Sequence, residues 1–328
     1  MISPQLNYAA HNGTVEWGLT VRWGNNFLLE STQPLVATVY KCGVLADNEC
    51  SLCVNLEYTR PQLNCDWCES KISGVTNCHY KSQCLLTDVA TCPAPRIDKV
   101  WPLSGPVNGG TRVTIEGSNL GAKFEDIENA VTVSKVGCIP FRELYLPSKR
   151  IVCELKWRGQ LDQGPIIVSL GTEASRYHTN FEFRSPSVSH ISPTDGPRSG
   201  GTRVTIYGVH MDTGAVQTAT FGDAPCIIDK SKIRNTSIEC ITTSVWHAEA
   251  QGPIRVEFDG TSKTVQKFFA YREDPTVTGI GPLKSILEGG RNLTVRGTSF
   301  QFIQEPKMFA WVPTITGEYY PTNTTVSI

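Results

Sequence analysis

Apolar and polar residues alternate in one short segment that occurs three times along the chain. In the first copy, Thr111–Glu116, the apolar residues Val113 and Ile115 fall on one face of an extended chain. Arg112 and Thr114 fall on the other face. A two-residue period of this kind is typical of a half-buried β-strand. The two later copies place their apolar residues in the same way, at Val204, Ile206, Leu293 and Val295.

Each alternating segment lies inside a longer repeat that predicts a strand, a turn and a second strand. The copies run over 95–117, 186–208 and 275–297, so they begin 91 and 89 residues apart. Such a period is the size of one β-sandwich domain. In the first copy, Ile97 and Val100 begin a strand and Pro102–Gly110 is a turn, because proline fixes φ and paired glycines reach positive φ freely. The second strand is predicted to end each time at a glycine, at Gly117, Gly208 and Gly297.

Later landmarks repeat as well and predict the remaining strands of each sandwich. Cys138 and Cys153 are matched by Cys226 and Cys240, and 163–168 by 251–256. The segment 181–184 is matched by 269–272 and is predicted as the final edge strand. Because no segment has a sustained 3.6-residue apolar period, we expect little helix.

The two ends of the chain look like parts of further sandwiches. Leu19–Trp23 and Leu35–Lys41 are predicted as the last two strands of a preceding one, and the third copy is expected to stop short of its final strands. No signal peptide pattern follows Met1, so we expect an internal fragment of a longer protein. The expected segments are the end of a preceding sandwich (1–40), a cysteine-rich module (41–93), two sandwiches (94–184 and 185–272) and a truncated one (273–328).

Cysteines change the interpretation of the region between the sandwiches. Eight of the twelve lie close together, at Cys42, Cys50, Cys53, Cys65, Cys68, Cys78, Cys84 and Cys92. An even count at this density indicates disulfides and an oxidising compartment, although spacing alone cannot choose among 105 pairings. About 50 residues cannot fold on burial alone, and disulfides of roughly 2–4 kcal/mol each supply the difference. Trp67 is the expected apolar body around which they pack, with an exposed binding anchor as its alternative role.

A zinc ribbon is the alternative for this region. The pairs Cys50/Cys53 and Cys65/Cys68 have the spacing of a four-thiolate zinc site. That interpretation leaves four further cysteines without a role, and the flanking sequence looks extracellular. We therefore predict no metal. The later pairs, Cys138 with Cys153 and Cys226 with Cys240, are expected to form one disulfide in each sandwich.

Composition narrows the class of protein further. The 328 residues carry a net charge of −1, which does not favour a nucleic-acid partner. No apolar run approaches the roughly 20 residues of a membrane helix. Four N-glycosylation sequons begin at Asn12, Asn235, Asn292 and Asn323, in agreement with a secretory origin. The sequence has no hydrolase elbow, P-loop or zinc-protease motif, so we predict no catalytic site, no cofactor and no enzyme.

These segments resemble two module families. The eight-cysteine region with Cys65-Asp-Trp-Cys68 resembles the plexin–semaphorin–integrin (PSI) module, and the Gly-Gly-Thr-Arg-Val-Thr-Ile repeats resemble the immunoglobulin-like, plexin and transcription factor (IPT/TIG) domain. A PSI module between IPT/TIG sandwiches is similar to a plexin ectodomain. The resemblance implies a mainly β chain of tandem immunoglobulin-like sandwiches plus one disulfide-rich module. It also implies the pairs Cys42–Cys65, Cys50–Cys92, Cys53–Cys78 and Cys68–Cys84.

The plexin resemblance implies a receptor stalk on the extracellular side of the plasma membrane. The parent would bind semaphorins through a propeller absent from this chain, and would signal in axon guidance and cell migration through an absent membrane span and cytoplasmic region. Co-receptors or self-association of the ectodomain are further possible partners. The alternatives are an ectodomain of the hepatocyte growth factor receptor type, an intracellular TIG module for DNA binding or dimerisation, and an accessory domain of a carbohydrate-active enzyme.

Overall fold

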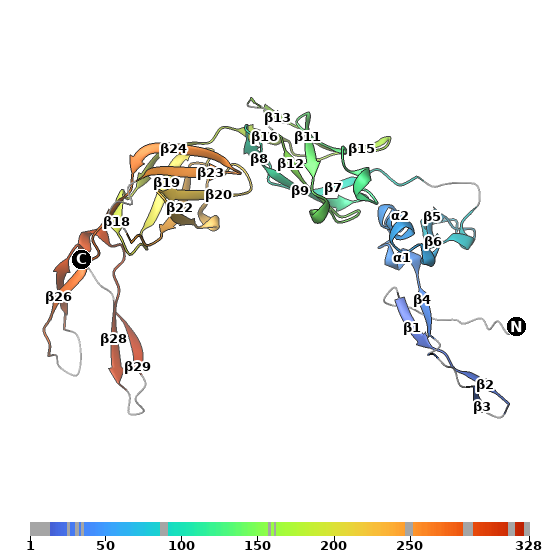
Figure 1. The fold of residues 1–328 in the computed structure, drawn as a ribbon, viewed down its shortest axis with the longest axis horizontal. Coiled ribbons are helices and arrows are strands. Elements are labelled where there is room, and N and C mark those ends of the chain that lie inside the picture. The colour runs from blue at the N-terminus through green and yellow to red at the C-terminus, as the bar shows by residue number, and fades with distance from the viewer. Residues whose placement is uncertain are drawn as a thin grey trace. The chain divides into compact units, whose positions relative to one another are not determined.

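The structure is a computed structural model, and it describes residues 14–24, 27–29, 33, 36–85, 91–156, 159–160, 162–246, 252–284, 291–313 and 319–324. The chain is mainly β, as the sequence predicts. It divides into two compact units: one holds Met1–Leu103 with Thr111–Glu182, and the other holds Ser104–Gly110 with Phe183–Ile328. Figure 1 shows the labelled helices and strands, coloured from blue at the N-terminus to red at the C-terminus.

Two small antiparallel pairs come first. They are formed by β1 (Thr14–Gly18) with β4 (Val36–Tyr40) and by β2 (Val21–Trp23) with β3 (Phe27–Leu29). The two strands predicted in this region overlap β2 and β4, but each is paired with a different neighbour rather than with the other. Their membership of a preceding sandwich stays a prediction.

The cysteine-rich module packs two short helices against a hairpin. Its elements are α1 (Cys42–Leu45), α2 (Cys50–Thr59), η1 (Pro61–Leu63), β5 (Cys65–Glu69), β6 (Thr76–Tyr80) and η2 (Lys81–Gln83). The sequence did not predict α2, whose buried face consists of Cys50, Ser51, Cys53 and Leu56. This face is too small to give an apolar period. The helix is instead held by its two cysteines and by packing on β5 and β6.

The first sandwich is built around a seven-stranded sheet in the order β15–β14–β10–β11–β12–β9–β7. These strands are β7 (Arg96–Trp101), β9 (Arg112–Ser118), β10 (Val131–Val133), β11 (Val136–Pro140), β12 (Arg150–Leu155), β14 (Ile166–Leu170) and β15 (Glu173–Arg176). A three-stranded sheet, β13–β16–β8, consists of β8 (Ser104–Pro106), β13 (Asp162–Gly164) and β16 (Phe181–Arg184). Val113 and Ile115 are fully buried, as their alternation predicts.

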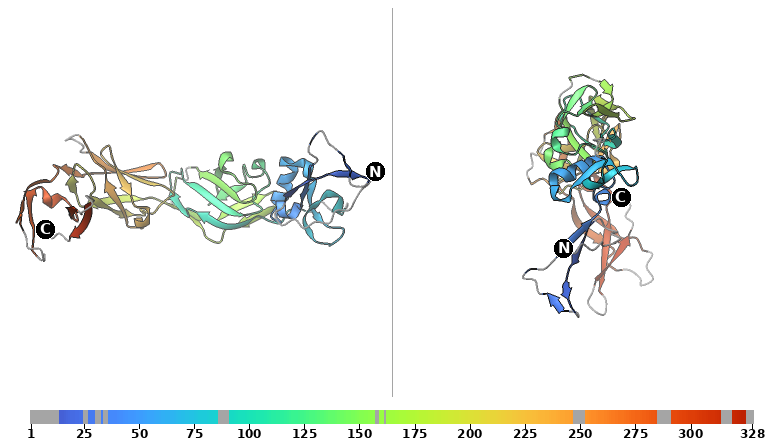
Figure 2. Two further views of the ribbon diagram at one scale, coloured as in Figure 1. Left: turned by 90° about the horizontal axis from the view of Figure 1, so that it is seen from below. Right: turned by 90° about the vertical axis from the view of Figure 1, so that its right-hand side faces the viewer.

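The second sandwich repeats this plan (Figure 2). Its seven-stranded sheet runs β17–β19–β22–β21–β20–β23–β24. The strands are β17 (Ser187–Ser192), β19 (Arg203–Val209), β20 (Gln217–Phe221), β21 (Ala224–Ile228), β22 (Ser237–Thr242), β23 (Pro253–Phe258) and β24 (Thr261–Phe268). A parallel pair, β18 (Asp195–Pro197) and β25 (Ala270–Arg272), forms a separate two-stranded sheet. Val204 and Ile206 are buried in the core with Phe221, Phe258 and Phe269.

The third repeat begins in the same way. Strand β26 (Thr276–Gly281) pairs with β27 (Thr294–Thr298), and β28 (Met308–Pro313) pairs with β29 (Tyr319–Thr324) after the turn η6 (Phe300–Phe302). The prediction for Leu293 is wrong. It lies outside β27 and is 45% exposed.

Two further predictions need correction. Gly117, Gly208 and Gly297 do not end their strands, since β9, β19 and β27 each continue past the glycine. In all three repeats the glycine faces a backbone carbonyl of the first strand, close to a bulge in that strand. The segment 181–184 is not an edge strand, because β16 lies between β13 and β8.

Candidate functional site

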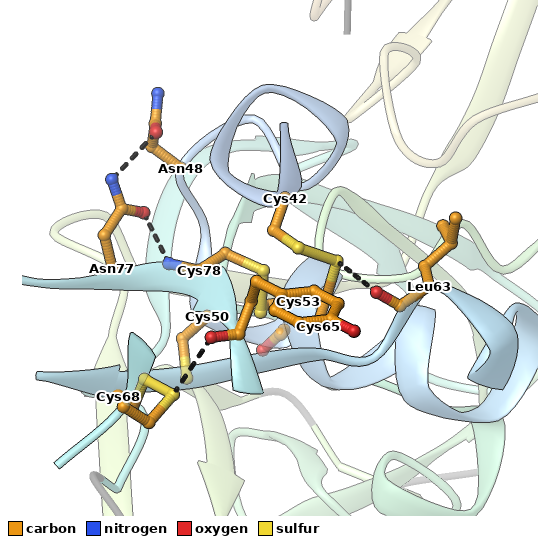
Figure 3. Close-up of a disulfide and its surroundings, with 12 residues drawn as sticks. Cys42, Asn48, Cys50, Cys53, Leu63, Cys65, Cys68, Asn77 and Cys78 are labelled. Atoms are coloured by element: carbon orange, nitrogen blue, oxygen red, sulfur yellow. Dashed lines mark hydrogen bonds between the residues drawn. A yellow bond between two sulfur atoms is a disulfide. The ribbon is translucent and has the colours of Figure 1, made fainter. Parts of the chain in front are cut away.

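The disulfide module brings its eight predicted cysteines together in four pairs. They are Cys42–Cys65, Cys50–Cys92, Cys53–Cys78 and Cys68–Cys84, with Cα atoms 5.4 to 5.6 Å apart. Each cysteine of the two Cys-x-x-Cys motifs has a partner outside those motifs, so the four sulfurs do not form one tetrahedral set. Figure 3 shows Cys42, Cys50, Cys53, Cys65, Cys68 and Cys78 gathered inside the module.

The module has a small core around its sulfurs. Cys42, Cys53, Cys65 and Cys78 are buried with Ala46 and Leu56, and Trp67 packs against this cluster. The prediction that Trp67 is an apolar body for the disulfides is therefore confirmed. Asn77 braces the outer edge, because its Nδ2 donates to Asn48 Oδ1 at 2.9 Å and its Oδ1 accepts from the N–H of Cys78 at 2.7 Å (Figure 3).

Each complete sandwich carries one further disulfide. Cys138 on β11 is joined to Cys153 on β12, and Cys226 on β21 to Cys240 on β22, with Cα atoms 5.4 Å apart in both. All four cysteines are buried. Each bond therefore links two neighbouring strands inside a packed core, where its role is structural.

The most specific site in the first unit is the joint between the module and the first sandwich. Lys149 extends toward the module and forms ion pairs with Glu49 Oε1 at 2.5 Å and with Asp47 Oδ2 at 2.8 Å. The other carboxylate oxygen of Glu49 accepts a hydrogen bond of 2.5 Å from the hydroxyl of Ser148. Glu49 thus holds the two residues that come directly before β12.

Three more contacts cross the same joint. The N–H of Ser51, on α2, donates to Asn119 Oδ1 at 3.2 Å. Asn55, one helical turn further on, donates through Nδ2 to the carbonyl of Ala122 at 2.7 Å. At the end of α2, the ammonium of Lys123 lies 4.7 Å from the ring centre of Tyr58, a cation–π distance. These contacts are spread along α2 from Ser51 to Tyr58, so the module is attached to the first sandwich at several points.

The electrostatics of the joint favour a charged Lys149. Partial burial lowers the pKa of the ammonium, but hydrogen bonds to Asp47 and Glu49 outweigh this effect, so the pKa lies above its usual value. Because the group is more than one third exposed, each ion pair contributes no more than about 1 kcal/mol. The joint depends on the sum of its contacts.

Tyr145 supports the loop that forms the sandwich side of this joint. Its hydroxyl donates to the carbonyl of Gly121 at 2.7 Å, and its ring packs edge-on against Phe124. Burial is the main reason that the pKa of Tyr145 lies above its usual value, so the hydroxyl stays a donor. The loop is thereby fixed in the conformation that presents Ala122 and Lys123 to α2.

A second joint lies within the other unit, where the third repeat meets the second sandwich. Asp274 accepts a hydrogen bond of 2.7 Å from the N–H of Ser199. Gln304 binds the backbone of Arg203 twice, at 2.8 Å to its N–H and at 3.1 Å to its carbonyl. Arg272 stacks at 5.5 Å over Phe302. Beside these contacts a groove of about 710 Å³ is lined by both acidic and basic residues.

The sequons lie in different settings. Asn235 is exposed, and its Oδ1 accepts from the N–H of His210 at 3.1 Å. Asn292 is also exposed. Asn12 and the side chain of Asn323 lie outside the described residues. Glycosylation of all four stays a prediction.

Over the described ranges, no cluster of three or more His, Cys, Asp or Glu residues could hold a metal ion. Within the same part of the chain, no helix is long and apolar enough to cross a membrane.

Sequence reasoning missed both joints. Asp47, Glu49, Asn119 and Lys149 belong to no motif, and their partners lie far away in the sequence. The available signal was a difference between repeats, because Lys149 of the first corresponds to Thr236 of the second. At this position the difference between the two copies coincides with an additional contact in the first copy.

Comparison with known proteins agrees with this arrangement of modules. The IPT/TIG domain family model matches residues 95–183 and 186–271. Human (Homo sapiens) Plexin-B1 is 36% identical over 310 residues, which cover 93% of this chain and 14% of that protein. Plexin A3 of Danio rerio is 32% identical over 313 residues, which cover 91% of this chain and 16% of the relative. The chain therefore spans about one sixth of these relatives or less.

A solved structure is similar over nearly the whole chain. The full extracellular region of Plexin A4, domains 1 to 10, superimposes with a TM-score of 0.74 and 29% sequence identity. The match covers 95% of this chain and 27% of that one. A second structure of this region, with domains 1 to 8, gives a TM-score of 0.62 over 80% of the chain.

Proposed function

This chain belongs to the IPT/TIG domain family as an extracellular segment of a plexin-type receptor, and from this premise we propose that its work is mechanical. It is a stalk segment that sets the distance and orientation between the ligand-binding part of the receptor and the membrane. The growth-factor receptor and DNA-binding alternatives are not favoured by the relatives that match.

The single observation that supports this role best is the joint at Glu49. One carboxylate holds both Ser148 and Lys149 of the first sandwich. Four disulfides make the module behind it stiff, because they restrict a segment too small to be held by burial. A stiff module held at several points transmits orientation, whereas a flexible linker would lose it.

The second joint supports the same role. Asp274 lies in the short Glu273-Asp274-Pro275 linker, and its side chain binds the second sandwich through Ser199. Proline at 275 fixes one backbone angle. Gln304 adds a further attachment point to the backbone of Arg203. The linker is therefore bound rather than free, which restricts the hinge between the two domains.

The partners follow from the receptor family. We propose that the parent protein binds semaphorins through a propeller outside this chain, and that co-receptors or self-association of the ectodomain act beside it. Guidance of axons and cell migration would be its biological output. The chain itself would contribute no catalytic step.

The test is a change of linker length in the full receptor. Inserting flexible Gly/Ser residues between Glu273 and Asp274 should weaken autoinhibition or ligand-driven signalling without changing semaphorin affinity. The same insertion after Gly171, in an exposed turn between β14 and β15, is the control, because it leaves both joints unchanged. Unchanged signalling in the linker variant would show that rigid positioning is not required.

A further inference from the structure

The two complete sandwiches share one corner of their backbone in full detail. In the first sandwich this corner consists of Asn119, Ser148 and Lys149, and we call it the first corner. Asn119 is left-handed, with φ of 53°, and its N–H donates to Ser148 Oγ at 2.9 Å. The N–H of the following residue, Leu120, donates to the carbonyl of Ser148 at 3.1 Å.

The second corner, His210, Asn235 and Thr236, has the same hydrogen bonds. His210 is left-handed, with φ of 56°, and its N–H donates to Asn235 Oδ1 at 3.1 Å. The N–H of the next residue, Met211, donates to the carbonyl of Asn235 at 2.8 Å. Asn235 therefore takes the place of Ser148.

The two corners differ in the side chains that they carry and in what those side chains contact. The first corner binds the disulfide module, with Ser148 and Lys149 both held by Glu49, and Ser148 is fully buried there. In the second corner Thr236 replaces the lysine, which removes the charge needed for such a contact. Asn235 is exposed and begins the sequon Asn235-Thr236-Ser237.

A glycan on the Asn235 carboxamide is compatible with the folded second sandwich. Its Oδ1 is used by His210, while no described residue accepts a hydrogen bond from Nδ2. N-glycosylation uses Nδ2 alone. From a lipid-diphosphate-linked oligosaccharide donor, the bond between sugar C1 and the diphosphate oxygen breaks and the C1–Nδ2 bond forms. One Nδ2 proton is lost to a base, and the lipid diphosphate leaves. In the folded product, Oδ1 can still accept from the N–H of His210.

We propose that Asn235 carries an N-linked glycan that covers the second corner, the surface corresponding to the one that binds the disulfide module in the first sandwich. The same backbone conformation then binds a protein module in the first sandwich and carries a sugar in the second. The loop after the second corner is already in contact with other residues, since the N–H of Gly214 donates to the Ser104 carbonyl at 3.1 Å. Arg184 also pairs with Asp212 at 3.2 Å, so the glycan covers the remaining open side of the corner. This inference rests on the proposed extracellular role.

The first test is glycopeptide and disulfide mapping of the full receptor, secreted or displayed by a eukaryotic cell. Wild type should carry a glycan at Asn235, and Ser237→Ala should lose it while keeping the carboxamide that binds His210. An unmodified Asn235 with all disulfides formed would overturn this inference and leave the proposed function standing. Free cysteine thiols would overturn the proposed function instead.

The second test asks whether the sugar covers the corner. Hydroxyl-radical footprinting should give slower oxidation of His210 in the glycosylated wild type than in Ser237→Ala. His178, exposed on the first sandwich, is the internal control and should react equally in both. Equal oxidation of His210 in both proteins would contradict coverage, even if the glycan is present. Thermal unfolding of Ser237→Ala checks that the comparison is made between two folded proteins.

Discussion

Gly117 on β9 lies so close to the carbonyl oxygen of Arg96 on β7 that any side chain at this position would overlap with that oxygen. The same relationship recurs between Gly208 and the Ser187 carbonyl, and between Gly297 and the Thr276 carbonyl. In each repeat the partner strand has a bulge nearby. The glycine therefore lets two backbones approach inside the sheet.

Replacing Gly117 by alanine should destabilise the first sandwich. The new methyl group forces β7 and β9 apart, and overpacking of this kind lowers the free energy of unfolding by about 1–3 kcal/mol. Thermal or denaturant unfolding of the segment measures the loss. Gly137→Ala is the matched control, because Gly137 also lies in a strand and has no atom within 4 Å of the added group. Equal losses in both variants would contradict the close-approach explanation.

The repeated strands were predictable because their signal is local. Val113 and Ile115 alternate with polar neighbours, and both are buried in the sheet. The sandwich class and the period of the repeat follow from such local patterns and from turn residues. The limit appears at Leu293, which has the same pattern but is exposed. Alternation states which face can be buried, and a second layer must be present to bury it.

The joints were not predictable because they depend on contacts between distant residues. Lys149 and Glu49 are 100 residues apart in sequence, and the sequence around either residue does not predict the contact. The glycines were misinterpreted for a related reason: a strand end and a close approach to a neighbouring strand have the same local sequence. Only the placement of Arg96 beside Gly117 separates the two explanations.

Removing the ammonium at the module joint should loosen it. Lys149→Ala loses both ion pairs and leaves Glu49 with Ser148 alone, so amide exchange at the N-terminal end of α2 should rise. Partly exposed ion pairs are worth about 0.2–1 kcal/mol each. Local opening should therefore increase only several-fold at low salt, as measured by hydrogen exchange.

Two controls separate the ion pairs from general effects at this joint. Lys149→Arg keeps a cation in reach of Asp47 and Glu49 and should retain most of the protection. Lys99→Ala removes an exposed lysine from β7 of the same sandwich and should change nothing at α2. If Lys149→Ala exchanges at the wild-type rate, the ion pairs do not hold the module.

Deprotonation of Lys149 should weaken the joint in strongly alkaline solution. The pKa of Lys149 is raised in the folded protein by its hydrogen bonds to Asp47 and Glu49, against the lowering effect of burial. A raised folded-state pKa means that the contribution is fully present below the unfolded value of 10.5 and is lost as the pH rises through the folded value. A donor fluorophore on the module and an acceptor on the first sandwich should report the opening as a loss of energy transfer.

Lys149→Arg provides the control for alkaline opening, because its guanidinium stays charged to a higher pH. Its midpoint should lie above that of the wild type. Tyr145, whose pKa is also raised, is common to both proteins, so its titration affects both curves equally. Identical midpoints would assign the opening to groups other than Lys149.

Removing one sandwich disulfide should lower the stability of that sandwich alone. Cys138→Ala with Cys153→Ala opens a loop with a sequence separation of 15, for which loop entropy predicts a loss of about 3 kcal/mol. Cys226→Ala with Cys240→Ala is the matched variant, with a separation of 14 in the second sandwich. Native-state hydrogen exchange resolves the two sandwiches separately. Each double variant should lower the protection of its own buried strands and leave the other sandwich at the wild-type level. An equal loss in both sandwiches would mean that they unfold as one cooperative unit, and each disulfide would then stabilise more than the core that contains it.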